Sequence, residues 1–168
     1  MNAVSMHVGI VSDTHDNGSL VEAAVETFED AGCETVFHCG DFVAPFSVTP
    51  FDGDWSFYAV RGNNDGEWAV QSTVAEFGTY FGEMGELTID GHTIAVYHGT
   101  SEEIVDALVD CGTYDYVLHG HTHERGHEER GDTERINPGG ISIPPAPEPF
   151  SVATLSTDSG EVEFHELE

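Results

Sequence analysis

The chain has 168 residues, which suits one domain that buries roughly two thirds of its unfolded surface. Four arginines, no lysine and 32 acidic residues give a formal net charge of −28, and this charge disfavours nonspecific binding to a nucleic-acid backbone. No stretch of about 18 apolar residues occurs, which excludes a membrane-spanning helix. The N-terminus has no basic lead or cleavage site, and Cys33, Cys39 and Cys111 form no C-x-x-C pair. We expect a single cytoplasmic domain over residues 1–168.

The acidic residues are spread through every segment, while 39% of the chain is hydrophobic. This combination predicts a folded core beneath an acidic surface. Such a surface repels itself in dilute buffer, but at 1 M salt the screening length falls to about 3 Å. The composition therefore predicts a protein from a salt-accumulating, halophilic cell.

The first third of the chain alternates strands with a helix. "MHVGIVSD" predicts a buried strand, "TVFHCGD" a second and "WSFYAVRG" a third. "NGSLVEAAVETFEDAG" predicts a helix that ends at Gly32, because its apolar residues recur at helical spacing. The order strand, helix, strand favours parallel pairing in an α/β layer.

The rest of the chain predicts hairpins and one more helix. "GELTIDGHTIAVYHG" predicts a hairpin that turns at Asp90 and Gly91, and "SEEIVDALVDCG" a helix capped by Ser101. "YDYVLHGH" predicts a strand, whereas "HERGHEERGDTERINPGG" and "FSVATLSTDSGEVEFHEL" predict two further hairpins. The proline-rich "IPPAPEPF" predicts a loop, and residues 66–84 show no clean period.

Polar side chains gather where five of these strands end. The five clusters are Asp13-Thr14-His15, Gly40-Asp41, Gly62-Asn63-Asn64-Asp65, His98-Gly99 and Gly120-His121-Thr122-His123. The carboxyl ends of the strands in an open α/β sheet form one edge, where ligands usually bind. We expect the clusters to meet at that edge.

The spacing and chemistry of these residues suit metal ions. Residues two apart in an extended segment point to the same side, so Asp13 with His15, and His121 with His123, can each face one point. Carboxylate, imidazole and amide ligands suit Mn²⁺, Fe²⁺, Co²⁺, Ni²⁺ or Zn²⁺. Seven candidate ligands are too many for one ion and suit two that share a carboxylate. Two ions about 3.5 to 4 Å apart are the apparatus for attack on a phosphoryl centre.

The ordered set D-x-H, G-D, G-N-x-D, H-G and G-H-x-H, from Asp13 to His123, resembles the calcineurin-like metallophosphoesterase superfamily. The compact length and "NPGG" at residues 137–140 resemble its small prokaryotic phosphodiesterase branch. This resemblance implies an α/β (α+β) fold: a four-layer αββα sandwich of two packed β-sheets flanked by helices. It also implies a dinuclear site, with manganese favoured.

The resemblance assigns the ligands by motif. Asp13, His15 and His123 would hold the first metal. Asn63, His98 and His121 would hold the second, and Asp41 would bridge the two. Five other histidines lie outside the motifs and are expected to be structural or surface residues, while His119 is a candidate for a contact behind the ligands.

One position departs from the family pattern. Most of the superfamily carries histidine where this chain has Asn64, and that histidine protonates the leaving group and is oriented by the following acid, here Asp65. An amide donates a hydrogen bond but does not surrender a proton at useful pH. We therefore expect activity on esters with good leaving groups, with Asn64 and Asp65 as candidate catalytic residues. Arg61 is a candidate for holding a phosphate or an acidic neighbour.

These features favour a divalent-metal-dependent phosphodiesterase that hydrolyses small phosphate esters with a metal-activated hydroxide. Two alternatives stay open: a phosphomonoesterase or nucleotidase, and a non-catalytic scaffold like the related retromer subunit. Scaffolds tend to lose ligands that this chain keeps. Aromatic residues in the loops at residues 66–84 and 141–150 could support a homo-oligomer.

Overall fold

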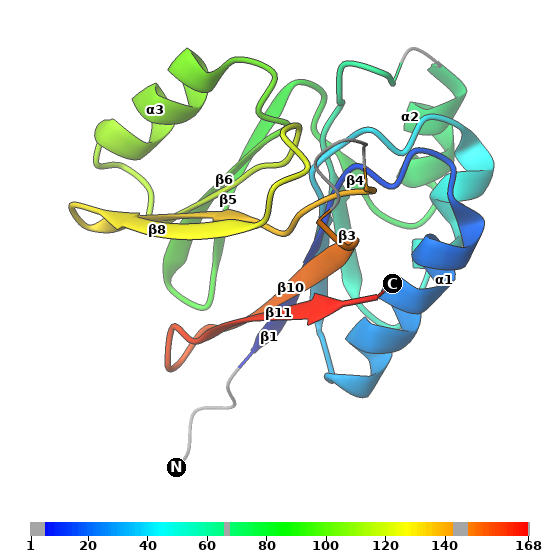
Figure 1. Ribbon diagram of the computed structural model, residues 1–168, viewed down its shortest axis with the longest axis horizontal. Coiled ribbons are helices and arrows are strands. Elements are labelled where there is room, and N and C mark those ends of the chain that lie inside the picture. Colours follow the sequence, from blue (N-terminus) through cyan, green and yellow to red (C-terminus); the bar gives the residue numbers. More distant parts are fainter. Residues whose placement is uncertain (1–5, 66–67, 143–147, 168) are drawn as a thin grey trace.

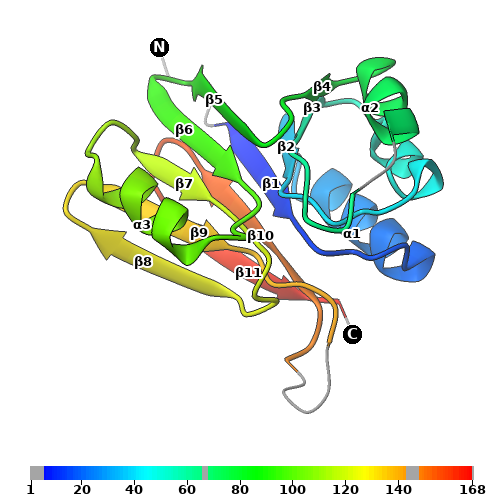
Figure 2. The same ribbon diagram turned by 90° about the horizontal axis from the view of Figure 1, so that it is seen from above.

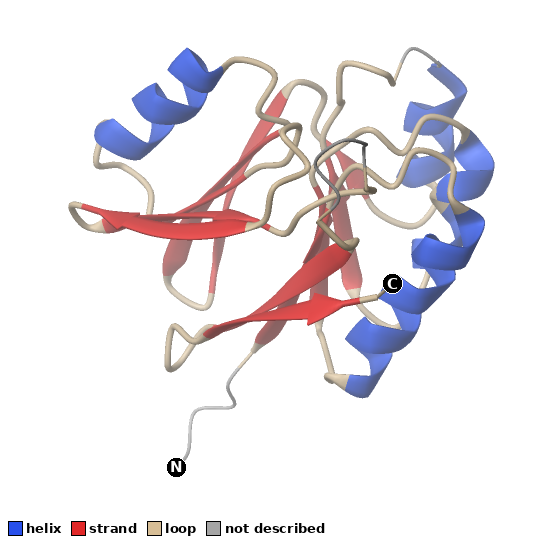
Figure 3. Ribbon diagram, viewed as in Figure 1, coloured by secondary structure: helices blue, strands red, loops and turns tan. Residues whose placement is uncertain are grey.

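The computed structural model describes residues 6–65, 68–142 and 148–167. Two β-sheets pack face to face, and helices cover both outer faces (Figures 1 and 3). Helices α1 (Gly18–Asp30) and α2 (Trp68–Ala75) lie on one side, and α3 (Glu102–Asp110) lies on the other (Figure 2). The predicted αββα sandwich is confirmed.

The first sheet has six strands in the order β11-β10-β1-β2-β3-β4. Its parallel part comprises β1 (His7–Val11), β2 (Thr35–His38), β3 (Ser56–Ala59) and β4 (Thr79–Tyr80). The hairpin of β10 (Ser151–Ser156) and β11 (Val162–Glu166) joins it antiparallel to β1. The parallel pairing predicted for the first three strands is confirmed.

The second sheet has five strands in the order β5-β6-β7-β9-β8. They are β5 (Met84–Ile89), β6 (His92–Tyr97), β7 (Tyr116–Leu118), β9 (Thr133–Asn137) and β8 (Gly126–Arg130). Strand β7 runs parallel to both β6 and β9, and β5 and β8 are antiparallel edges. Asp90 and Gly91 form the predicted turn with φ of 50° and 80°, as a two-residue hairpin of this type requires.

Three apolar clusters fill the three interfaces of the sandwich. Strand β1 shows the arrangement, because Val11 packs toward α1 and α2 while its neighbour Ile10 packs between the sheets. Both are fully buried, as expected of a central strand covered on both faces. Val105 and Val109 of α3 pack on the outer face of the second sheet.

Residues 66–84 contain α2 and β4, which the sequence did not predict. Helix α2 buries Val70 and Val74 but leaves Trp68 81% exposed, so its apolar residues do not form one stripe. Two 3₁₀ turns, η1 (Pro45–Ser47) and η2 (Thr49–Phe51), were also not predicted. Most of the predicted proline-rich loop falls outside the described residues. No helix in the described ranges is long and apolar enough to cross a membrane.

Gly9→Ala is expected to destabilise the fold by about 1–3 kcal/mol, as over-packing of a core does. A Cβ at Gly9 would lie 2.7–2.9 Å from three ring carbons of Phe28, which is fully buried and has no room to move. Gly126→Ala in the edge strand β8 is the control, because its Cβ would meet open space. Urea unfolding of both variants in concentrated KCl measures the difference, and equal stabilities would contradict the packing argument.

Candidate metal centre

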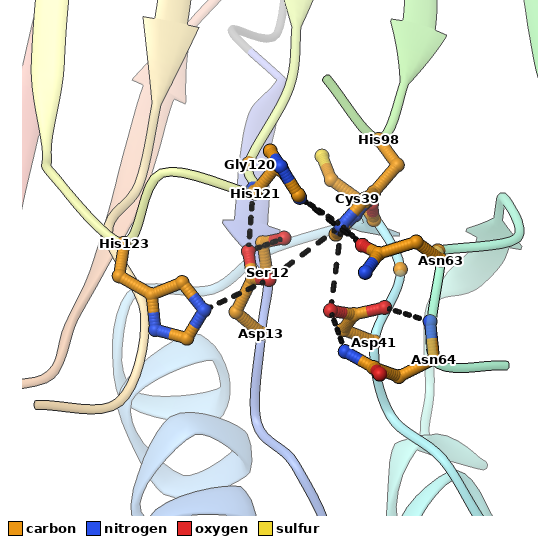
Figure 4. Close-up of polar contacts among 12 residues, drawn as sticks. Ser12, Asp13, Cys39, Asp41, Asn63, Asn64, His98, Gly120, His121 and His123 are labelled. Atoms are coloured by element: carbon orange, nitrogen blue, oxygen red, sulfur yellow. Dashed lines mark hydrogen bonds and ion pairs between the residues drawn. The ribbon is translucent and has the colours of Figure 1, made fainter. Parts of the chain in front are cut away.

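The five predicted polar clusters meet at one edge of the sandwich. They follow the carboxyl ends of β1, β2 and β3 in the first sheet and of β6 and β7 in the second. Figure 4 shows side chains from both sheets converging on this edge. The structure brings together all seven predicted ligands: Asp13, His15, Asp41, Asn63, His98, His121 and His123.

Asp13 and Asp41 lie at the centre of the cluster. Asp13 Oδ1 is 3.3 Å from Nε2 of His123 and 3.7 Å from Nε2 of both His15 and His98. Asp41 Oδ2 is 3.3 Å from Nε2 of His15 and 3.4 Å from Nε2 of His98. One oxygen of Asp41 therefore faces a histidine from each predicted metal set, which is the placement that a bridging carboxylate needs.

The second predicted set is equally compact. Asn63 Oδ1 lies 3.0 Å from Nε2 of His98 and 3.1 Å from Nδ1 of His121, and those two nitrogens are 3.3 Å apart (Figure 4). These three side chains come from the ends of β3, β6 and β7. A neutral amide oxygen and two imidazole nitrogens thus face one point.

The donor atoms fit divalent cations. In the described part of the chain, the buried Asp13 Oδ1 and His15 Nε2 have no hydrogen-bond partner. Nδ1 of His98 donates to the Cys39 carbonyl at 2.7 Å, and Nδ1 of His123 donates to the Ile141 carbonyl at 2.8 Å. Each ring therefore turns Nε2 toward the carboxylates, an arrangement typical of metal-ligating histidines. Asp13 belongs to two groups whose ligand atoms lie within 4.8 Å of one another, one with His15 and His123 and one with Asp41 and His98.

The imidazoles and carboxylates shift one another's pKa values strongly. Burial alone would raise the pKa of Asp13, but contacts with His123 and His15 outweigh burial and hold that pKa well below its usual range. Burial likewise opposes the contacts of His15 and His98 with Asp41, whose pKa is also held well below its usual range. In return, Asp13 and Asp41 raise the pKa of His15 to about 9. Without metal, bound protons therefore balance part of the carboxylate charge.

The loops that carry the ligands adopt left-handed backbone conformations. Asp13, His15, Asp41, His121 and His123 all have φ between 43° and 75°. Non-glycine residues rarely adopt such angles, and each typically costs on the order of 1–3 kcal/mol unless the surroundings hold it. Backbone hydrogen bonds hold the first three of them, because the N–H groups of Asp13 and His15 donate to the Gly40 and Asp41 carbonyls, each at 2.9 Å.

Asp65 joins the loop that contains Asp41 to the loop that contains Asn63 through hydrogen bonds. Its buried carboxylate accepts the backbone N–H groups of Asp41 and Val43 at 2.7 Å and of Gly62 at 2.8 Å. In the described structure, the hydrogen bonds of the Asp65 side chain go to these three backbone donors and not to the side chain of Asn64. Burial raises the pKa of Asp65, and the backbone donors oppose that rise.

Gly62 and Gly120 allow the loops to approach this closely. A Cβ at Gly62 would overlap the Asp41 carboxylate and backbone, and a Cβ at Gly120 would overlap the side chains of Ser12 and Asp13. A side chain at either position would therefore displace a predicted ligand.

Arg61 pairs with an acidic neighbour. Its Nε donates to the Asp65 carbonyl at 2.7 Å, and its guanidinium forms an ion pair with Glu83 at 3.0 Å. The other three arginines, Arg125, Arg130 and Arg135, are also paired with carboxylates.

Three residues support the ligands from behind, and only Ser12 among them carried no sequence signal. Ser12 donates its hydroxyl to Asp13 Oδ2 at 2.6 Å. His38, which is fully buried, accepts the Gly40 N–H at its Nδ1 and contacts the Thr14 hydroxyl, both at 3.1 Å, so it is the structural histidine that we expected. His119 accepts a hydrogen bond from Arg135 Nε at 3.2 Å and adjoins the Gly120 carbonyl behind the ligand loop.

Comparison with known proteins agrees with this site. Residues 6–160 match the calcineurin-like phosphoesterase superfamily domain. The chain belongs to this superfamily. Within it, the chain is 37% identical over 141 residues to the phosphodiesterase MJ0936 of Methanocaldococcus jannaschii, covering 80% of this chain and 83% of the relative. It is 27% identical over 169 residues to the phosphodiesterase YfcE of Escherichia coli, covering 91% and 89%.

Two solved structures share the fold. An archaeal phosphodiesterase superposes with a TM-score of 0.89 at 33% identity, covering 96% of this chain and 100% of that one. A variant of Vps29 from Entamoeba histolytica has a TM-score of 0.71 at 17% identity, covering 95% and 97%, and shows the shared fold alone.

Protons and metal ions are expected to compete for this site. The pKa of His15 rises from 6.5 to about 9 in the metal-free folded state, so its proton stabilises the fold fully below pH 6.5 and this contribution is lost as pH rises through 9. We expect metal-free protein to lose stability over that window and protein with Mn²⁺ to lose less. Denaturant unfolding near pH 6 and near pH 9, with EDTA or Mn²⁺, measures this. A metal-free protein that becomes more stable as pH rises would contradict the charge balance, and His15→Gln should flatten the slope.

Proposed function

We propose that the protein is a divalent-metal-dependent phosphodiesterase. The observation that carries this proposal is the clustering of seven candidate ligands, two of them buried carboxylates, with Asp13 Oδ1 and His15 Nε2 left without hydrogen-bond partners in the described structure. Membership of a phosphoesterase superfamily, with a 37% identical relative named as a phosphodiesterase, supports the same reaction.

The proposed ligand sets follow the geometry. Asp13, His15 and His123 hold one ion, and Asn63, His98 and His121 hold the other. Asp41 lies between the sets as the bridge. When bound, two divalent ions supply Lewis acidity toward phosphoryl oxygens and make water a nucleophile at neutral pH. Four imidazole nitrogens and three oxygens suit Mn²⁺, Fe²⁺, Co²⁺, Ni²⁺ or Zn²⁺, and we propose manganese among these ions.

The chain's own residues prepare the site for an anionic ester. Asn63 contributes an oxygen without adding a negative charge, and the carbonyls of Cys39 and Ile141 fix the rings of His98 and His123. The pairing of every arginine with a carboxylate supports a diester over a monoester. A monoester phosphate carries nearly two negative charges at neutral pH, and its second charge would meet no unpaired guanidinium. A phosphomonoesterase is therefore the less favoured alternative.

We also propose that the protein works in the cytoplasm of a salt-accumulating cell, because 32 acidic residues against only four arginines give it a net charge of −28. Three free cysteines support a reducing compartment. Exposed Phe46 and Trp68 would support a homo-oligomer.

Asp41→Ala is expected to abolish hydrolysis, with a loss larger than the roughly 10–100-fold that removal of an outer-shell partner causes. The wild type should hydrolyse bis(p-nitrophenyl) phosphate faster than p-nitrophenyl phosphate when Mn²⁺, Ni²⁺ and Zn²⁺ are tested in turn in concentrated KCl. Asp158→Ala, in the remote β10–β11 turn, is the control. Unchanged turnover in Asp41→Ala would rule out the shared-carboxylate site, and a wild type that binds no metal in calorimetry would favour the scaffold.

The free energy of unfolding is expected to be larger in about 2 M KCl than in dilute buffer, because screening removes repulsion within the acidic surface. Urea unfolding at a series of KCl concentrations measures this dependence. Greater stability in dilute buffer would contradict the proposed halophilic origin.

A further inference from the structure

Asn64 binds both oxygens of the Asp41 carboxylate. Its backbone N–H donates to Oδ1 at 2.9 Å and its side-chain Nδ2 donates to Oδ2 at 2.8 Å (Figure 4). We propose that Asn64 is a positioning residue that fixes the bridging carboxylate, and that it does not protonate the leaving group. This inference rests on the proposed function of the site.

The two hydrogen bonds from Asn64 fix the orientation of the Asp41 carboxylate as well as the distance between the loops. A carboxylate held at one oxygen still rotates about its Cβ–Cγ bond, whereas a carboxylate held at both does not. Oδ2 of Asp41 is also the oxygen that faces Nε2 of His15 at 3.3 Å and Nε2 of His98 at 3.4 Å. Asn64 therefore determines which way the shared oxygen points.

The chemistry of the amide suits this role. An amide NH₂ is a donor at every accessible pH, while a neutral imidazole has one donor nitrogen and one acceptor nitrogen. Hydrogen bonds to a carboxylate are charge-assisted and stronger than neutral ones. The opposite orientation of the Asn64 amide would place its oxygen against Asp41 and repel it. One of the two N–H groups of the Asn64 amide is therefore engaged by Asp41.

The two loops hold one another reciprocally. The Asp41 carboxylate accepts the Asn64 N–H, and the Asp65 carboxylate accepts the Asp41 N–H at 2.7 Å. Asp65 thus fixes the backbone of Asp41, and Asn64 fixes its side chain. Asn64 itself is exposed, so its substitution leaves no core cavity.

Two variants separate positioning from an action on the leaving group. Asn64→Ala removes the side-chain donor and keeps the backbone donor, and Asn64→Asp replaces the donor with a charged acceptor of the same shape. Calorimetric titration of metal-free protein with Mn²⁺ should show affinity lowered by about tenfold in Asn64→Ala, the effect typical of an outer-shell partner, and by more in Asn64→Asp. Thr133→Val is the matched control, because it removes one buried hydroxyl bond, to the Tyr114 carbonyl, and should keep wild-type affinity.

The leaving-group dependence gives the second readout. At saturating Mn²⁺, a positioning role predicts that Asn64→Ala lowers kcat by a similar factor for a series of aryl phosphodiesters, so the slope of log kcat against leaving-group pKa stays unchanged. Unchanged metal affinity together with a steeper slope would overturn the proposal, because Asn64 would then act on the leaving group. A wild type that binds Mn²⁺ but hydrolyses no diester would refute the proposed function alone, since the affinity comparison needs no turnover.

Discussion

Two carboxylates are buried side by side, and the rest of the site must compensate for their negative charge. Asp13 is fully buried and Asp41 is 2% exposed, and both belong to one group of ligand atoms within 4.8 Å. Ionised carboxylates are stable in such a place only when charges and hydrogen bonds compensate for lost water. Hydrogen bonds from Ser12, the His121 N–H and Asn64 satisfy three of the four oxygens, and Asp13 Oδ1 remains without a donor. The remaining compensation is cationic, and protons on imidazoles or divalent ions supply it.

The same requirement explains the unusual backbone of the loops. Ligands can converge from both sheets only if the chain turns sharply as each strand ends, which places five of the seven ligands at positive φ. The central strands hold these strained loops in place, because β1 and β2 are buried on both faces and end only two and three residues before Asp13 and Asp41, respectively. Asp65 then joins the loops, since its three backbone bonds link residues from two different strand ends.

The sequence predicted the strands, the αββα layers and the convergence of the ligands, because these follow from periodic patterns and from motifs at strand ends. It missed α2, whose exposed Trp68 breaks the helical stripe. It gave no sign that the Asp65 carboxylate accepts N–H groups as far as 24 residues away. Contacts between loops depend on how far apart two strand ends lie in the folded sheet, and no local sequence pattern encodes that distance. The substitution of histidine by Asn64 was visible in the sequence, but its bonds to Asp41 were not.

An acidic surface is compatible with an anionic substrate because the repulsion acts over a longer range than the contacts that bind the substrate. A net charge of −28 repels a phosphate ester over the distance at which the surface field acts, and screening in molar salt shortens that distance to about 3 Å. The contacts that recognise the ester act at bonding distance and survive such screening. Because the arginines are paired with carboxylates, the ions proposed to bind at Asp13, Asp41 and their histidines would supply the attraction. Under the proposed function, positive charge would be concentrated at one buried point, and the proposed salt-rich solvent would allow an anion to reach it.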